Sequence, residues 1–193
     1  MYVDTNRELW NLWTKLNAAS KECSDLLMQL KAGRTTLEKV ELEELNDVAG
    51  KTLLHLQCHF GLDTFSWARE GAIVTGVDIS EEAIVLARSL SQELNIEAEF
   101  IRSAIYDLPA RLNAQFDIVY TMSHPPHMAY YWPHSLGEII TALCSAGLRI
   151  EFLHEFPETV EERSYEEVGP GRYELRVHRE VVIPGQYSIQ ATH

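Results

Sequence analysis

After Gly50 the chain alternates short apolar runs with segments of helical periodicity, and this alternation restricts the fold more than any other feature. It is typical of a parallel sheet whose strands are connected by crossover helices. A nearly continuous apolar run also fits a strand that is buried on both faces. The predicted strands are Thr52–Leu56, Ala72–Val77, Glu99–Arg102 and Phe116–Tyr120, with helices over 63–69 and after Ser80. We therefore expect an α/β fold.

The segment before the sheet is predicted to be helical. From Thr5 to Leu16 the apolar side chains have the spacing of one buried helical face, and Asp4 or Thr5 is the expected cap. The side chains expected on that face are Leu9, Leu12, Trp13 and Leu16. Residues 1–50 are therefore expected to form a helical cover for the sheet.

The segment after the sheet has mixed patterns. A helix is predicted over 135–146 and a strand over 148–153. The tail then alternates over Tyr173–Val182 and Gln186–Thr192, around Pro184-Gly185. This pattern predicts a C-terminal antiparallel hairpin.

The composition excludes several classes of partner. The 193 residues include 29 acidic and 16 basic side chains, which give a net charge of -13. Nucleic acids and anionic membranes bind clustered positive charge, which this chain does not offer. No apolar run approaches the ~20 residues of a membrane-spanning helix, and Met1–Asp4 does not begin an export signal. We expect a cytoplasmic protein whose three widely spaced cysteines are reduced.

The residues with chemical potential follow the first two strands. Gln57–Gly61 predicts a sharp turn into a helix whose first amides face the carboxyl edge of the sheet, where polar ligands bind. Asp78 ends the second strand about twenty positions further on, a spacing that suits the hydroxyls of a ribose. These residues predict an adenosine-containing ligand, and they do not separate a dinucleotide from another adenosine cofactor.

In this order the motifs resemble the class I S-adenosylmethionine-dependent methyltransferases. Those proteins commonly read V-L-D-L-G-C-G-x-G in strand one, V-x-G-x-D-x-S at strand two and F-D-x-V in strand four. This chain has LLHLQCHFG at 53–61, VTGVDIS at 74–80 and FDIV at 116–119. HLQCHFGLDT at 55–64, YVDTN at 2–6 and WPHSLGE at 132–138 are similar to a subgroup of bacterial methyltransferases. The resemblance covers most of residues 1–156 and implies a Rossmann-like, doubly wound, mostly parallel sheet.

The resemblance also implies a cofactor and its contacts. S-adenosylmethionine would be the methyl donor, S-adenosylhomocysteine the product, and an unidentified small molecule the acceptor. The turn would contact the methionine end, Asp78 the ribose, and Ile79 with 103–105 the adenine, while the helix with Trp10 and Trp13 would form a lid. The cofactor-binding residues implied in this way are Trp13, Gln57, Cys58, His59, Gly61, Asp78, Ile79, Ala104 and Ile105. No catalytic residue and no metal is assigned.

Two departures from the family pattern open an alternative. Ala104 stands where many relatives have an acidic residue that accepts the adenine amino group. Between Tyr120 and Trp132 a central strand–helix unit of the family is missing. We expect one domain over 1–193, with a cofactor-binding core at 51–122 and a shortened half at 123–193. It is either a methyltransferase or a catalytically impaired relative that serves as a ligand-binding or homo-oligomeric assembly module.

Other side chains have simpler interpretations. Gln57, His59 and Leu62 replace the glycines of a G-x-G-x-x-G turn, which disfavours a nucleotide-dependent oxidoreductase. Cys58 is expected to be a small buried residue rather than a nucleophile. The histidines at 124, 127 and 134 match no closed zinc site, so we expect a solvated loop there, with a general base for the acceptor as the alternative.

Overall fold

The structure, a computed structural model, divides the chain into two units, Met1–Tyr131 and Trp132–His193. The first unit contains a parallel sheet, and the second contains antiparallel strands. The residues described are 2–112, 116–121, 136–145, 147, 149–156, 158–159, 166–169, 172–178, 181–183 and 186–192.

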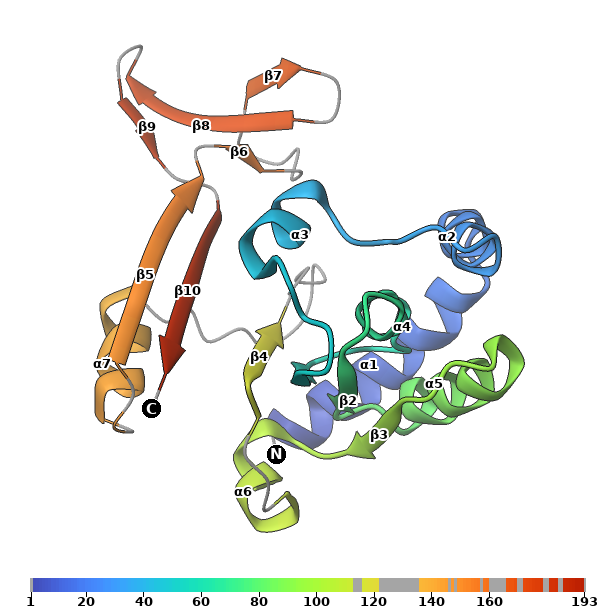
Figure 1. Cartoon of the computed structure of the whole chain (residues 1–193). Helices are drawn as coiled ribbons and strands as arrows, with labels where there is room; N and C mark the ends of the chain where they lie inside the picture. The colour runs from blue at the N-terminus through green and yellow to red at the C-terminus, as the bar shows by residue number, and fades with distance from the viewer. Residues whose placement is uncertain are drawn as a thin grey trace. The chain divides into compact units, whose positions relative to one another are not determined.

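Helices precede the sheet in the first unit, as predicted. They are α1 (Tyr2–Ala18), α2 (Lys21–Lys31) and α3 (Lys39–Leu45), shown in blue in Figure 1. α2 begins after Ser20, whose hydroxyl accepts the amide hydrogen of Cys23 at 3.1 Å. Such a cap provides a partner for an amide that has none within the helix.

The sheet confirms the predicted alternation of strands and helices. Its strands lie in the order β3-β2-β1-β4, and every pair is parallel. The carboxyl ends of the strands therefore lie along one edge. The elements are β1 (Thr52–Leu56), α4 (Leu62–Arg69), β2 (Ile73–Asp78), α5 (Glu81–Leu94), β3 (Glu99–Arg102), a 3-10 turn (Ile105–Asp107), α6 (Leu108–Arg111) and β4 (Ile118–Thr121).

Apolar side chains cover both faces of this sheet. On one face Leu53 and Val74 cluster with Trp67 of α4, and on the other Leu54 and Val77 cluster with Leu108 of α6. Leu53 and Trp67 are completely buried. Burying a large apolar side chain contributes about 1.5–3 kcal/mol, so these clusters hold the strands that carry the site.

The buried face predicted for α1 is wrong. Leu12 and Leu16 are each 55% exposed, whereas Thr14 is 2% exposed. Leu9 and Trp13 are half-buried. The helix includes Asp4 and Thr5, so neither residue caps it. The reason is that the polar side of α1 forms hydrogen bonds with Ser80, the N-cap of α5. These bonds turn the polar side of α1 inward and leave Leu12 and Leu16 exposed.

Among its described residues the second unit contains α7 (Leu136–Ser145) and six strands, all in antiparallel pairs: β5 (Arg149–Phe156), β6 (Glu158–Thr159), β7 (Glu166–Gly169), β8 (Arg172–His178), β9 (Val181–Ile183) and β10 (Gln186–Thr192). A C-terminal antiparallel hairpin is present, but its strands are β8 and β9. The prediction that the strands flanking Pro184-Gly185 pair with each other is wrong, because β10 pairs along its length with β5. A partner distant in sequence therefore replaces the local one.

Candidate functional site

The turn between β1 and α4 has an unusual backbone. Gln57, His59 and Gly61 have φ angles of 56°, 51° and 83°, in the left-handed region that favours glycine. The amide of Cys58 donates to the carbonyl of Val77 at 3.0 Å, which ties the turn to β2. A Cβ atom on Gly61 would lie 2.8 Å from the ring of Phe100, so this position requires glycine for space as well as for φ.

Asp78, at the end of β2, lies against this turn. Its carboxylate accepts the amide hydrogen of His59 at 2.9 Å and that of Ser80 at 2.8 Å, and its side chain is 7% exposed. Burial raises the pKa of Asp78, and the amides of Ser80, His59 and Ile79 oppose that rise. A carboxylate offers about four acceptor positions, so three amides leave room for a ligand hydroxyl.

The end of β3 adjoins Asp78 on the other side. Ser103 is 2% exposed, and its amide donates to the carbonyl of Asp78 at 2.9 Å. Ala104 follows with no side-chain acceptor, and Ile105, at 42% exposed, begins the 3-10 turn. The predicted residues Gln57 to Gly61, Asp78, Ile79, Ala104 and Ile105 therefore lie at the ends of three adjacent strands.

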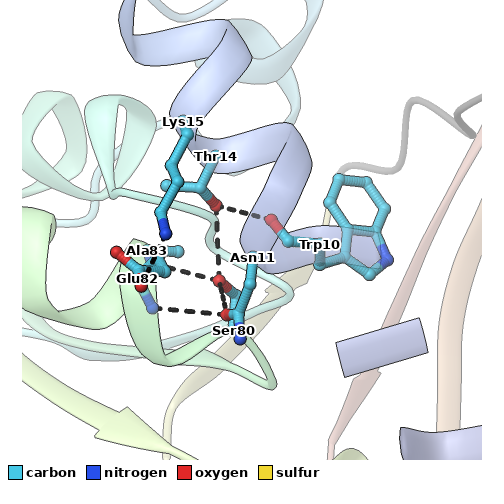
Figure 2. Close-up of polar contacts among 7 residues, drawn as sticks. All are labelled: Trp10, Asn11, Thr14, Lys15, Ser80, Glu82 and Ala83. Carbon is cyan, nitrogen blue, oxygen red and sulfur yellow. Dashed lines mark hydrogen bonds and ion pairs between the residues drawn. The ribbon is translucent and has the colours of Figure 1, made fainter. Parts of the chain in front are cut away.

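Helix α1 contacts this edge through Thr14. The Thr14 hydroxyl donates to the carbonyl of Trp10 at 2.8 Å, so its oxygen is left to accept the Nε2 hydrogen of His59 at 3.1 Å. Thr14 also lies 3.3 Å from the hydroxyl of Ser80, the N-cap of α5 (Figure 2). A single buried hydroxyl thus connects α1 to the turn and to the start of α5.

Two further contacts hold α1 on α5. The Ser80 hydroxyl donates to the Asn11 side-chain oxygen at 2.7 Å, and Lys15 forms an ion pair with Glu82 at 3.1 Å (Figure 2). Both Lys15 and Glu82 are largely exposed, so this ion pair contributes little. Asn11 and Thr14 were not predicted from the sequence, although both are polar residues on the helix that was expected to form the lid.

His59 is the residue of the turn that meets α1. Its ring lies 6.0 Å from that of Trp10 in a T-shaped arrangement and 4.2 Å from that of Phe60. Burial lowers the pKa of His59 to about 4, so the ring is neutral at pH 7. The indole beside the turn is therefore that of Trp10, and the half-buried Trp13 lies one helical turn further along α1.

Cys58 has the buried position expected of it. It is 4% exposed, and its thiol donates to the carbonyl of His59 at 3.4 Å. Burial, followed by the charge of Asp78, raises the pKa of this thiol well above its usual value. Cys58 is therefore a core residue with no thiolate character.

A second set of polar side chains forms contacts between β1, β4 and the helices α3 and α4. The Nδ1 atom of His55 lies 2.8 Å from the Thr64 hydroxyl, and both side chains are buried. The Tyr120 hydroxyl donates to the Glu41 carboxylate, and the Tyr120 ring lies 4.6 Å from that of His55. Burial raises the pKa of both Glu41 and Tyr120. These contacts join α3 and α4 to the strands that end at the site.

Within the described part of the chain, no group of three His, Cys, Asp or Glu side chains is placed to hold a metal ion. The histidines at 124, 127 and 134, and the segment from 122 to 132 predicted to lack a strand–helix unit, lie outside the described residues. Among the helices that the structure describes, none has the length and apolar character needed to cross a bilayer.

Comparison with known proteins gives curated relatives with a common activity. The chain is 31% identical over 140 residues to the magnesium-protoporphyrin O-methyltransferase of Rhodobacter capsulatus, covering 72% of this chain and 60% of that protein. It is 34% identical over 87 residues to the ubiquinone biosynthesis O-methyltransferase of Vibrio campbellii, covering 45% of this chain and 37% of the relative. The chain thus spans 60% or less of the length of these two relatives.

A solved structure confirms the fold class. The magnesium protoporphyrin IX methyltransferase of Synechocystis, crystallised with bound S-adenosylmethionine, matches with a TM-score of 0.52 at 17% identity. The match covers 80% of this chain and 90% of that one. Residues 53–147 match the family described as "Methyltransferase domain". Over these residues the chain is therefore similar to methyltransferases, and its fold is that of the class I S-adenosylmethionine-dependent methyltransferases.

Proposed function

We propose that this chain binds S-adenosylmethionine across the ends of β1, β2 and β3 and transfers its methyl group to a small molecule. The observation that carries the proposal is Asp78, a buried carboxylate bonded to the amide of His59 in the turn and to the amide of Ser80 beyond it. Such a carboxylate at the end of the second strand has the chemistry to bind ribose hydroxyls.

The residues present fit this cofactor. Asp78 retains acceptor capacity for a hydroxyl, and Gly61 keeps the backbone of the turn free of a side chain. Ile79 and Ile105 offer apolar surface for an adenine, and Ala104 lies between the end of β3 and the 3-10 turn. Ala104 cannot accept the adenine amino hydrogens, and a missing hydrogen bond of this kind weakens affinity by about 0.5–1.5 kcal/mol.

The work required of the protein is mainly positioning. The bound cofactor supplies a methyl group on a positively charged sulfur, which is already activated for transfer. Asp78 and the turn fix the ligand along the edge, and α1, held by Thr14, shields it from water. Holding the reacting atoms in line in this way supplies much of the rate acceleration. No side chain is assigned as a general base.

For the acceptor, a small molecule is favoured over a nucleic acid. One named relative is a magnesium-protoporphyrin O-methyltransferase, and the other is an O-methyltransferase of ubiquinone biosynthesis. The net charge of -13 gives no attraction for phosphate backbones. The relatives therefore support an oxygen nucleophile on an organic molecule as the methyl acceptor, and the charge disfavours a nucleic acid.

The alternative is an impaired relative that serves as an assembly module. Its support is β4, which within the described residues pairs only with β1 and has Val119 62% exposed. Unpaired strand edges are sites of association between chains. A soluble homo-oligomer formed through this edge would be the expected result of that function.

Isothermal titration tests the proposal directly. We expect both S-adenosylmethionine and S-adenosylhomocysteine to bind with 1:1 stoichiometry and to raise the melting temperature. Transfer is then measured with tritiated S-adenosylmethionine and a panel of porphyrin carboxylates and phenols. Absence of any heat or thermal shift with both ligands would overturn the proposal, whereas binding without transfer would favour the impaired relative.

A further inference from the structure

Gln57 has a backbone conformation that glycine would adopt more easily. The non-glycine residues with positive φ among those described are Asn46, Gln57, His59 and Asn95. Asn46 and Asn95 end helices α3 and α5, where asparagine is a common residue in this region. Gln57, with φ of 56°, does not end a helix and is not an asparagine. Its side chain is therefore present at a cost in strain.

Internal contacts do not offset this strain. The Gln57 side-chain oxygen accepts one hydrogen bond, from the Thr121 hydroxyl at 3.5 Å, between side chains that are exposed to solvent. This distance is at the long limit for a hydrogen bond. His59, by contrast, has a 3.1 Å contact to Thr14 and two aromatic neighbours. The side chain of His59 has a structural role, and that of Gln57 remains to be explained.

The position of Gln57 along the edge indicates what it faces. Thr121 ends β4 and pairs with Leu56 of β1, so Gln57 and Thr121 lie on the β4 side of the turn. Asp78 and Ala104 follow the strands on the other side. A ligand whose ribose binds Asp78 and whose adenine extends toward β3 must direct its sulfur toward β1 and β4. The two side-chain oxygens lie at that end.

We propose that Gln57 and Thr121 form a specificity-determining pair whose oxygens recognise the positively charged sulfonium and its methyl group. This inference rests on the proposed function. Oxygen dipoles are attracted to the charge on a sulfonium, and the neutral thioether of S-adenosylhomocysteine offers no such charge. The pair therefore favours the methyl donor over the product, which promotes product release.

The test compares affinities for the two ligands in the intact chain. In Gln57→Gly we expect the dissociation constant for S-adenosylmethionine to rise about two- to tenfold, the effect of one lost polar contact. The constant for S-adenosylhomocysteine should change less than twofold. Gln57→Glu should shift the ratio the other way, because a carboxylate attracts the sulfonium more strongly. Thr121→Val should resemble Gln57→Gly with a smaller change.

Asn95→Gly is the matched control. It makes the same substitution of glycine at a φ of 51°, at the end of α5 and away from the turn. Neither dissociation constant should change in this variant. Equal changes for both ligands in Gln57→Gly, or no change in either, would overturn the inference while leaving the proposed function intact. Failure of the unmodified chain to bind either ligand would instead overturn the proposed function itself.

Discussion

The carboxyl edge of the sheet is built differently at its two ends. At the ends of β1 and β2, Asp78, Ser80 and Thr14 are buried and bonded to one another. At the end of β4, Thr121 is exposed and its bond to Gln57 is 3.5 Å long. The polar side chains are therefore fixed at the first end and accessible at the second. This difference suits the proposed function, in which the cofactor is held at the first end and the acceptor enters at the second.

Removing the charge of Asp78 should have the largest effect on binding. In Asp78→Asn the side-chain NH2 group opposes the amide donors of His59 and Ser80, and the charge that suits a ribose diol is lost. Hydrogen bonds to charged groups contribute about 1.5–3 kcal/mol, so calorimetry should show S-adenosylmethionine affinity falling about ten- to a hundredfold or more.

Asp117→Asn serves as the control for this variant. Asp117 accepts hydrogen bonds from Thr52 at the opposite, amino edge of the sheet. Its substitution should leave S-adenosylmethionine affinity unchanged. Equal losses in the two variants would mean that Asp78 supports the fold and does not contact the ligand.

Acid should weaken the folded state through two histidines, the buried His55 and the half-buried His59. Burial lowers the pKa of His59 to about 4 and that of His55 to about 3, from 6.5. Below pH 6.5 the unfolded chain therefore binds protons that the folded chain does not. The contribution of the two histidines to the free energy of unfolding is therefore fully present above pH 6.5. It declines as the pH falls toward 4, by up to about 1.4 kcal/mol per pH unit for each histidine.

Urea unfolding at pH 7, 6 and 5 measures this slope. The raised pKa values of Asp78 and Glu41 act in the opposite direction, since these folded carboxyls keep protons that the unfolded chain has released. His59→Gln removes one of the two histidines that take up a proton on unfolding, so the free energy of unfolding should change less steeply with pH. A slope that is the same in His59→Gln would show that the His59 ring is not buried in solution.

The strands and the turn were predictable because their signals are local. β1 and β3 have the predicted bounds, and Ser80 caps α5 as its side chain and position indicated. The orientation of α1 was not predictable, because it depends on the contacts of the Ser80 hydroxyl with the Thr14 hydroxyl and with the Asn11 side-chain oxygen, which lie 66 and 69 positions away. The cofactor residues inferred from resemblance remain predictions until a ligand is measured.

The tail shows the same limit. Alternation over 186–192 correctly predicted β10, whereas the strand predicted over 173–182 divides into β8 and β9, which pair with each other. The pairing of β10 with β5 depends on a strand some thirty residues earlier in the chain. The strain at Gln57 could not be predicted either, because the sequence indicates a sharp turn but not the φ angle of each of its residues. Pairing and strain are properties of the assembled backbone, whereas periodicity is a property of the sequence.

The cover at the first end of the edge should depend on one hydroxyl. Thr14→Val keeps the shape of the side chain and removes the acceptor for His59. Loss of a buried hydrogen bond costs about 1–2 kcal/mol, so the melting temperature should fall and S-adenosylmethionine should bind less tightly. Leu16→Ala, on the exposed side of α1, should change both quantities little. A larger loss in Leu16→Ala would show that the apolar side of α1 holds the helix.

The smallest effect is expected at Val119 of β4. Its side chain is 62% exposed, so Val119→Lys should change the free energy of unfolding by no more than about 0.5 kcal/mol. If the exposed edge at β4 serves acceptor entry and not assembly, the protein should be a monomer. Light scattering should then give the mass of one 22.0 kDa chain before and after the substitution. An oligomer that dissociates in Val119→Lys would favour the assembly module. Val85→Lys, at 66% exposed on α5, controls for the added charge. Dissociation restricted to Val119→Lys would place the interface on β4, and the openness at this end would then belong to assembly rather than to acceptor entry.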